Sequence, residues 1–530
     1  MAQESRRRRI IALVTPRERA ALILLVLISA LLYYSHSITV IESNDSAGYV
    51  YGGIRIAETG LPNYENPLNE WAGPYFTLHA FKVRLDETGP SFYLNYSPGF
   101  PLVVALFRLL IPHPEAVFYA SPTMALLGLV GIYALGEALF SPRVGLAAAI
   151  LLAFDPVYFQ MAVLSRSDAP ATAMMLCSLA LFVTAAKRES GLLGLLSGLA
   201  LGFACLTRYV MVLTLVPLAI YLALGYGRAS LPKRAAGGFA LGFGAFAVAI
   251  MAFNRVYYGG FLTTGYSPPH FVIPYPLFHP SYFWGQSPIG PGGCDSTVRA
   301  LVSNFKFLLL FAPFSLLVMS RPAGGLAASL ALVFPLLFSF YLYPPQDFGT
   351  RFLLPSFVAL YLMVSQLASR VSEVMLHRRL LVSALILSAA LLWSLSGLPE
   401  TLETVNRRNE REASRVALVQ EFTSQTEETS VFLARRYHDQ IILYGQRSAI
   451  HFDMIPSLEA KAAGRAETEL ERRLVQVINT LLEAGVPVYW IPDSDPNRPD
   501  QLQLDPILPA HFRLLTWRER SPLIYSIQQK

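Results

Sequence analysis

Charged residues and cysteines are both scarce in this sequence. Asp, Glu, Lys and Arg make up 15% of its 530 residues, whereas about 25% is usual in soluble proteins. Of the three cysteines, Cys177 and Cys205 fall in apolar stretches and Cys294 stands alone, so the chain has neither a disulfide framework nor a zinc-binding cysteine pattern. The glycine patterns of nucleotide-binding loops and the Gly-x-Ser-x-Gly motif are also missing. Their absence argues against ATP hydrolysis and serine-type nucleophilic catalysis.

Apolar residues are abundant and clustered. They form 53% of the chain and recur in runs of roughly 20 residues between Ala20 and Pro399. A helix of that length spans about 30 Å, the thickness of the hydrocarbon core of a bilayer. We therefore predict an all-α polytopic membrane protein with about eleven transmembrane helices. The predicted spans are Ala20–Val40, Val117–Phe140, Val144–Val163, Ala169–Ala186, Gly191–Thr207, Val210–Tyr226, Ala235–Phe253, Phe307–Met319, Gly324–Tyr343, Phe352–Leu367 and Leu380–Leu398.

Basic residues predict the orientation of these spans. Residues 1–19 are rich in arginine, so we expect a cytoplasmic N-terminus, and every short loop then assigned to the cytoplasm carries Arg or Lys. Residues 41–116 form an external segment, in which Pro98–Ile111 is apolar but too short to span and predicts an interfacial helix. The net charge of +6 suggests anchoring of loops at the membrane rather than nucleic-acid binding.

The chain changes character after Pro399. Charges become frequent, strand-like runs occur at Ser430–Ala434, Val486–Ile491 and Phe512–Leu515, and Glu467–Glu483 has a helical pattern. This alternation predicts a small extracytoplasmic α/β domain over residues 399–530, after a membrane domain over residues 20–398.

Two acidic positions are predicted to lie at external ends of spans. Glu42 and Asp45 follow the first span, where a carboxylate can act as a general base or hold a cation, or simply be a solvated loop acid. Asp168 opens a predicted helix, where helix capping is the simpler explanation. The predicted topology places Asp45 and Asp168 on the same side of the membrane, which suits proton abstraction together with cation or hydroxyl binding.

Two arginines also lie at predicted external helix ends, against the usual charge distribution. Arg208 and Arg351 are each flanked by aromatic or apolar residues. Their side chains either reach toward lipid headgroups or bind a phosphate, for which a guanidinium group is suited. We favour phosphate binding.

A long external loop, residues 254–304, carries many aromatic residues. Its Tyr258 and Tyr266 can stack on sugars, but packing at the membrane interface is the more ordinary role for such residues. His270 and His279 are nearby, but their spacing matches no metal motif. A divalent cation therefore remains open as a cofactor, without any motif that indicates one.

Several short motifs over about residues 20–370 follow an order that is known from one superfamily. They are the acidic segment at Glu42–Tyr51, Tyr-Ser-Pro-Gly-Phe-Pro at Tyr96–Pro101, Asp155-Pro156, Ser-Asp-x-Pro at Ser167–Pro170, Leu-Thr-Arg-Tyr at Leu206–Tyr209, the tyrosine-rich Tyr258–Tyr266 and Arg-Phe-Leu-Leu-Pro at Arg351–Pro355. This layout resembles the GT-C superfamily of polyprenyl-phosphate-sugar-dependent glycosyltransferases. Within it the chain is similar to the protein O-mannosyltransferase and lipid A aminoarabinose transferase branch.

The resemblance implies a function and a set of site residues. A sugar would be transferred with inversion from a polyprenyl-phosphate donor to a lipid, glycan or protein acceptor at the extracytoplasmic face. Asp45 would be the general base, Asp168 the second acidic residue, and Arg208 and Arg351 the ligands of the donor phosphate. Additional substrate contacts would come from residues in the same external segments, namely Glu42, Tyr96, Tyr258 and Tyr266.

The sequence departs from the family pattern at two places. Ser46 follows Asp45 where some relatives have a second acid, and Asn95, Tyr96 and Ser97 stand where the family often has a lysine before paired prolines. A polytopic transporter or lipid flippase is the alternative class of protein. Transporters tend to carry charges near the middle of the membrane and in matching repeats, whereas here the notable charges lie at predicted external ends.

Overall fold

The computed structural model describes residues 16–86, 89–226, 231–267, 276–288, 292–305, 308–343, 350–374, 379–451, 466–492 and 504–530. The chain divides into two compact units, each built from three segments. We call the first the helical unit: Met1–Ser37, Phe118–Ala252 and Tyr275–Asn406. We call the second the mixed unit: Ile38–Val117, Phe253–Pro274 and Arg407–Lys530.

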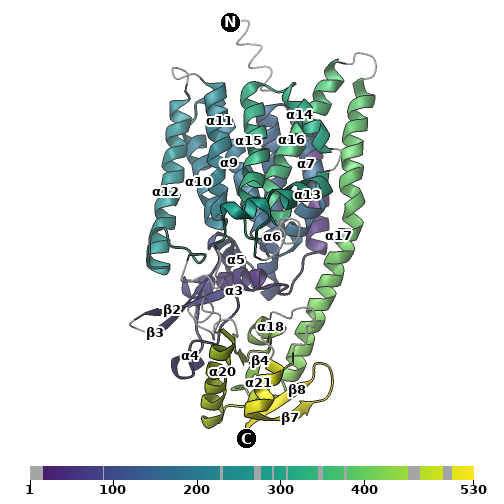
Figure 1. The fold of residues 1–530 in the computed structure, drawn as a ribbon. Helices are drawn as coiled ribbons and strands as arrows, with labels where there is room; N and C mark the ends of the chain where they lie inside the picture. The colour runs from purple at the N-terminus through teal and green to yellow at the C-terminus, as the bar shows by residue number, and fades with distance from the viewer. Residues whose placement is uncertain are drawn as a thin grey trace. The chain divides into compact units, whose positions relative to one another are not determined.

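Long apolar helices build the helical unit (Figure 1). Helix α9 packs between α6 and α10, α15 packs on α11 and α16, and α16 also packs on α7 and α14. Small residues allow these close approaches, because a Cβ on Gly145 would lie 2.3 Å from the Tyr133 carbonyl oxygen of the neighbouring helix. The helices are α2 (Pro16–Ser35), α6 (Ala120–Leu139), α7 (Pro142–Ala153), α8 (Pro156–Val163), α9 (Asp168–Arg188), α10 (Gly191–Thr207), α11 (Leu215–Gly225), α12 (Lys233–Tyr257), α13 (Gly293–Phe305), α14 (Leu308–Leu316), α15 (Arg321–Phe338), α16 (Leu354–Val374) and α17 (Arg379–Thr423).

Helical segments overlap each of the eleven predicted spans, although not every one of them is long enough to cross a membrane by itself. Within the described residues, six helices are long and apolar enough to cross a membrane, or up to eight crossings if each of two bent helix pairs counts as one. In α2 the side chains of Leu27 and Leu31 are 62% and 76% exposed, as expected where lipid rather than protein covers a helix. The chain is thus a multi-pass membrane protein.

One predicted span is broken in the structure. The segment predicted as Val144–Val163 forms α7 and α8, which meet at an angle of 67°. Asp155 stands at the break, and its Oδ1 accepts a hydrogen bond from the backbone N–H of Tyr158, which caps α8. Pro156 follows at the first helical position, where it needs no N–H partner. Tyr361 donates to the other carboxylate oxygen of Asp155 at 2.6 Å, so the buried acid is held by α16.

Short helices and a small sheet form the first part of the mixed unit. Helix α3 (Asn44–Thr59) packs on α5 (Gly99–Leu110), and a Cβ on Gly53 would lie 2.4 Å from Val104. The 12 residues of α5 span about 18 Å, too little to cross a bilayer. Leu109 and Leu110 on α5 are 68% and 69% exposed, which suits the predicted interfacial helix. An antiparallel sheet of order β1-β3-β2 adjoins them, with α4 nearby: α4 (Leu68–Trp71), β1 (Asn63–Tyr64), β2 (Phe81–Asp86) and β3 (Gly89–Leu94).

The C-terminal segment supplies a second sheet to the same unit. Its strand order is β5-β4-β6-β8-β7, in which β4 pairs in parallel with β5 and β6 while β8 runs antiparallel to β6 and β7. Helix α20 covers it with Leu474, Val477, Ile478 and Leu481, the spacing of one apolar helix face. The elements are β4 (Val431–Leu433), α18 (His438–Leu443), β5 (Ser448–Ala449), α20 (Ala466–Glu483), β6 (Val488–Trp490), α21 (Leu504–His511), β7 (Phe512–Arg518) and β8 (Ile524–Gln529).

The predicted strands and helix of this segment are confirmed as β4, β6, β7 and α20. The core of the sheet also contains Ala72 and Phe76 from the first part of the mixed unit. Helix α17 continues well past the predicted end of its span at Leu398 and stops only at Thr423. It therefore contributes its first part to the helical unit and its last part to the mixed unit.

Candidate functional site

Asp45 lies in the first turn of α3. Ser43 caps this helix in a reciprocal capping box with Ser46, and the helix dipole favours a negative charge at this end. The Tyr96 hydroxyl donates a hydrogen bond to Asp45 Oδ1 at 2.8 Å. Burial and the adjacent carboxylate raise the pKa of Tyr96 well above its usual value, so Tyr96 stays protonated and donates. Asp45 is partly exposed. The hydrogen bond from Tyr96 orients its carboxyl group.

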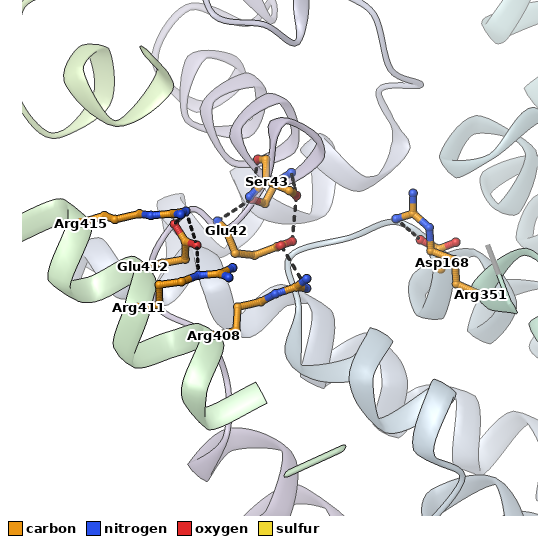
Figure 2. Close-up of polar contacts among 9 residues, drawn as sticks. Glu42, Ser43, Asp168, Arg351, Arg408, Arg411, Glu412 and Arg415 are labelled. Carbon is orange, nitrogen blue, oxygen red and sulfur yellow. Dashed lines mark hydrogen bonds and ion pairs between the residues drawn. The ribbon is translucent and has the colours of Figure 1, made fainter. Parts of the chain in front are cut away.

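Glu42, next to this cap, is buried in an ion pair. Arg408 Nη1 of α17 lies 3.4 Å from Glu42 Oε2, and the Ser43 hydroxyl donates to Glu42 Oε1 at 2.9 Å (Figure 2). The Glu42 side chain is 1% exposed. A buried carboxylate with this partner fixes the position of the chain before α3, and so it helps to place Asp45.

The same face of α17 holds a second buried acid. Glu412 is 1% exposed, and Arg415 donates to both of its carboxylate oxygens at 2.7 and 2.9 Å (Figure 2). Arg411 donates to Oε1 at 3.0 Å. Neither Arg408 nor Glu412 was predicted from the sequence. The available signal was the alternation of Arg and Glu at helical spacing over residues 407–415, which also fits a solvated helix face.

In the helical unit, Asp168 brings two arginines together. It begins α9, is 3% exposed and has one carboxylate oxygen toward each arginine. Arg208, which caps the C-terminus of α10, donates to Oδ1, and Arg351 Nη1 lies 3.6 Å from Oδ2 (Figure 2 shows the second pair). The side chains of Arg208 and Arg351 are 19% and 17% exposed. Asp168 thus places one carboxylate oxygen against each of the two guanidinium groups.

An aromatic ring orders the two guanidinium groups further. The Cζ atoms of Arg208 and Arg351 lie 5.0 and 5.1 Å from the ring centre of Phe352, within the range of cation–π attraction. A small pocket opens here, lined by Asp168, Thr172, Arg208, Val210, Met211, Phe338, Arg351, Phe352 and Pro355. Cationic donors around a partly apolar pocket are suited to an anionic group on an apolar molecule.

The predicted aromatic residues hold the mixed unit together. Tyr258 is 2% exposed, and its hydroxyl donates to the Leu94 carbonyl oxygen at 2.8 Å. Tyr266 is partly buried, with its ring centre 6.4 Å from that of Tyr96. The structure thus brings Tyr266 toward the Tyr96–Asp45 pair, while Tyr258 anchors the strand that leads to Tyr96. A contact of either tyrosine with a substrate stays a prediction.

The sequence did not point to any particular residue as a metal ligand. His270 lies outside the described residues, and His279 Nδ1 accepts a hydrogen bond from the backbone N–H of Ser281. Within the described ranges, a different group of His79, His438 and Asp439 comes close enough to share an ion. All three belong to the mixed unit.

Comparison with known proteins agrees with this architecture. The sequence model of the family described as dolichyl-phosphate-mannose-protein mannosyltransferase matches residues 95–253. The crystal structure of ArnT from Cupriavidus metallidurans bound to undecaprenyl phosphate is similar over 95% of this chain and 97% of its own, with a TM-score of 0.63 and 13% identity. The chain has the GT-C fold. The resemblance to GT-C glycosyltransferases that the motif order indicated is thereby confirmed.

Other GT-C structures show the same similarity at low identity. The archaeal oligosaccharyltransferase AglB from Archaeoglobus fulgidus, in complex with an inhibitory peptide and a dolichol-phosphate, has a TM-score of 0.54 and 13% identity over 90% of this chain and 69% of its own. The arabinofuranosyltransferase AftD from Mycobacteria has a TM-score of 0.59 and 14% identity over 96% of this chain and 41% of its own. No curated protein matches the sequence.

Proposed function

We propose that this protein transfers a sugar from a polyprenyl-phosphate donor to an acceptor hydroxyl, with inversion at the anomeric carbon. The arrangement of Arg208 and Arg351 around Asp168 carries the proposal, because it offers two cationic forks in a partly apolar pocket of a GT-C fold. The match to a family of dolichyl-phosphate-mannose transferases and the undecaprenyl phosphate bound by ArnT support this class of donor.

The arginines would act on the leaving group. When the bond between the anomeric carbon and the phosphate oxygen breaks, negative charge grows on the departing polyprenyl phosphate. Guanidinium groups that are already oriented stabilise this charge without reorganisation. Asp168 holds both groups in place by its two oxygens, which is the role we assign to this second acid. Polyprenyl phosphate leaves with the bonding electrons, and the two guanidinium groups offset the charge that develops on it.

Asp45 would act on the acceptor. Its carboxylate takes the proton of the acceptor hydroxyl while the hydroxyl oxygen attacks the anomeric carbon on the face opposite the phosphate. The hydrogen bond from Tyr96 orients the carboxylate, and Glu42 with Arg408 fixes the chain before it. Tyr266 is the aromatic residue that we expect near the sugar.

The membrane arrangement completes the proposal. Eleven spans, a cytoplasmic N-terminus and an extracytoplasmic segment 399–530 place both groups of residues at the outer face. This orientation can be checked with single cysteines at Glu65 and Glu189 in a variant without the three natural cysteines. An impermeant thiol reagent applied to intact cells should label the first and not the second, and the reverse pattern would refute the orientation.

Sugar transfer can be tested with the full-length protein in lipid vesicles. We expect the protein to release polyprenyl phosphate from a labelled polyprenyl-phosphate sugar in the presence of extracts containing lipid, glycan and protein acceptors. Donors carrying mannose and aminoarabinose would be compared, and nuclear magnetic resonance of the product gives the anomeric configuration. If labelled donor crosses the bilayer with its sugar–phosphate bond intact, the protein is a flippase and the proposal fails.

Arg408→Ala tests the positioning role of α17. We expect kcat to fall about 10-fold with little change in the KM for donor, because the chain before Asp45 loses the cation that holds Glu42 and the base is misplaced. Arg411→Ala is the matched control. Arg411 is 56% exposed and its partner Glu412 keeps Arg415, so kcat should stay near the unaltered value. Equal kcat values for the two variants would refute the positioning role.

A further inference from the structure

Three histidines and one aspartate of the mixed unit lie together in its core. They come from segments far apart in the sequence: His79 precedes β2, His438 and Asp439 begin α18, and His451 follows β5. His438 and His451 are each 1% exposed, and Asp439 is 5% exposed. Burying several titratable groups in one place is costly unless they are paired or bind an ion.

The distances within this cluster are close to those of a metal site. His79 Nδ1 lies 3.0 Å from Asp439 Oδ1, and one donor atom from each of His79, His438 and Asp439 lies within 4.8 Å of the others. Two ligands of one tetrahedral zinc ion are about 3.3 Å apart. The ring centre of His451 lies 4.4 Å from that of His79 and 5.4 Å from that of His438. Imidazole rings on one zinc ion have centres about 5 Å apart.

The surrounding backbone fixes two of these side chains in the form that a metal requires. His438 Nε2 lies 2.6 Å from the Thr77 carbonyl oxygen, which can only accept, so Nε2 carries a proton and Nδ1 is the nitrogen that would bind an ion. Asp439 Oδ1 accepts the backbone N–H of His79 at 3.1 Å. Metal-binding histidines and carboxylates are generally oriented by such hydrogen bonds to the backbone.

We propose that His79, His438, His451 and Asp439 bind one zinc ion. Three imidazole nitrogens and one carboxylate oxygen form a donor set that zinc accepts in tetrahedral geometry. Four protein ligands leave no position for a substrate, so the ion is structural. It links the segment before β2 to α18 and to the chain after β5, within the mixed unit. The proposal is independent of sugar transfer.

Metal analysis of the purified protein tests the site directly. The full-length chain, produced without a polyhistidine tag, should contain about one zinc ion per molecule by plasma mass spectrometry. His79→Ala and His451→Ala should lose this zinc. His511→Ala is the matched control, because His511 also pairs with a carboxylate, Glu471 at 2.9 Å, but is 40% exposed and stands apart from the cluster. Zinc content equal in His451→Ala and His511→Ala would overturn the proposal.

A measurement on the unaltered chain removes any dependence on whether the variants fold. After treatment with a chelator, added Co²⁺ should produce the visible absorption bands of a tetrahedral nitrogen and oxygen site. Added Zn²⁺ should abolish those bands and raise the midpoint of thermal unfolding, since an ion that binds only the folded chain stabilises it. If Co²⁺ produces no absorption bands and Zn²⁺ produces no thermal shift, the cluster is a metal-free part of the core and the proposal is wrong.

Discussion

Asp45→Asn should lower the rate of sugar transfer by about 10³-fold, a loss within the range expected for removal of a general base. Asparagine has the same shape and can still accept the hydrogen bond from Tyr96, so the N-terminal turn of α3 should persist. It cannot accept the proton of the acceptor hydroxyl. The loss should therefore appear in kcat, while the affinity for polyprenyl phosphate stays unchanged.

Two further variants separate the loss of the base from a structural defect. Tyr96→Phe removes the hydrogen bond to Asp45 but leaves the carboxylate, so we expect a loss of only about 10-fold. Glu65→Gln removes a carboxylate of the same unit that is 79% exposed, and it should have no effect. Transfer by Asp45→Asn at the rate of Glu65→Gln would show that Asp45 is not the base.

Much of the helical framework could be predicted, because lipid imposes a strong constraint on sequence. Apolar runs near 20 residues mark helices wherever the backbone must satisfy its own hydrogen bonds. The break at Asp155-Pro156 was visible as a motif, but the 67° angle between α7 and α8 was not. At the break, Asp155 is held by Tyr361 of α16, which is 206 residues away and could not be assigned as its partner from the sequence.

The set of chain segments that pack together in the mixed unit could not be predicted from the sequence. Its elements β4, β6, β7 and α20 have clear local patterns, whereas its core joins them to Ala72 and Phe76, about 400 residues earlier. Strands β2 and β3 were not predicted, because the only element predicted within residues 41–116 was the apolar helix at Pro98–Ile111. Partners that are distant in sequence leave no trace in local periodicity.

For the candidate site, too, individual residues could be predicted from local patterns but their distant partners could not. Asp45, Asp168, Arg208 and Arg351 were predicted as candidates because charge at the end of an apolar run is unusual. Their partners were not: Arg408 lies on an ordinary charged helix face, and the pairing of one acid with two arginines depends on how α9, α10 and the segment before α16 pack. The histidine cluster was missed for a related reason, since its members are separated by up to 372 positions and form no spacing motif.

Arg351→Ala should weaken binding of polyprenyl phosphate about 10- to 100-fold, the usual range for losing a hydrogen bond to a charged group. Asp168 keeps Arg208 as its partner in this variant, so the substitution does not leave an unpaired buried carboxylate. The pocket instead loses one of the two guanidinium groups that we propose as ligands of the phosphate. Binding of labelled polyprenyl phosphate to the protein in lipid nanodiscs measures the effect.

The charge and the shape of the guanidinium group can be distinguished with Arg351→Lys. An ammonium group preserves the net charge of the cluster but offers neither two parallel donors nor a planar face toward Phe352. We therefore expect an affinity between those of Arg351→Ala and the unaltered protein. Arg299→Ala is the matched control, because Arg299 forms an exposed pair with Asp295 in the same unit, and it should bind normally. Equal affinities of Arg351→Ala and Arg299→Ala would exclude Arg351 as a phosphate ligand, and the proposed donor site would then keep only Arg208 as its cationic group.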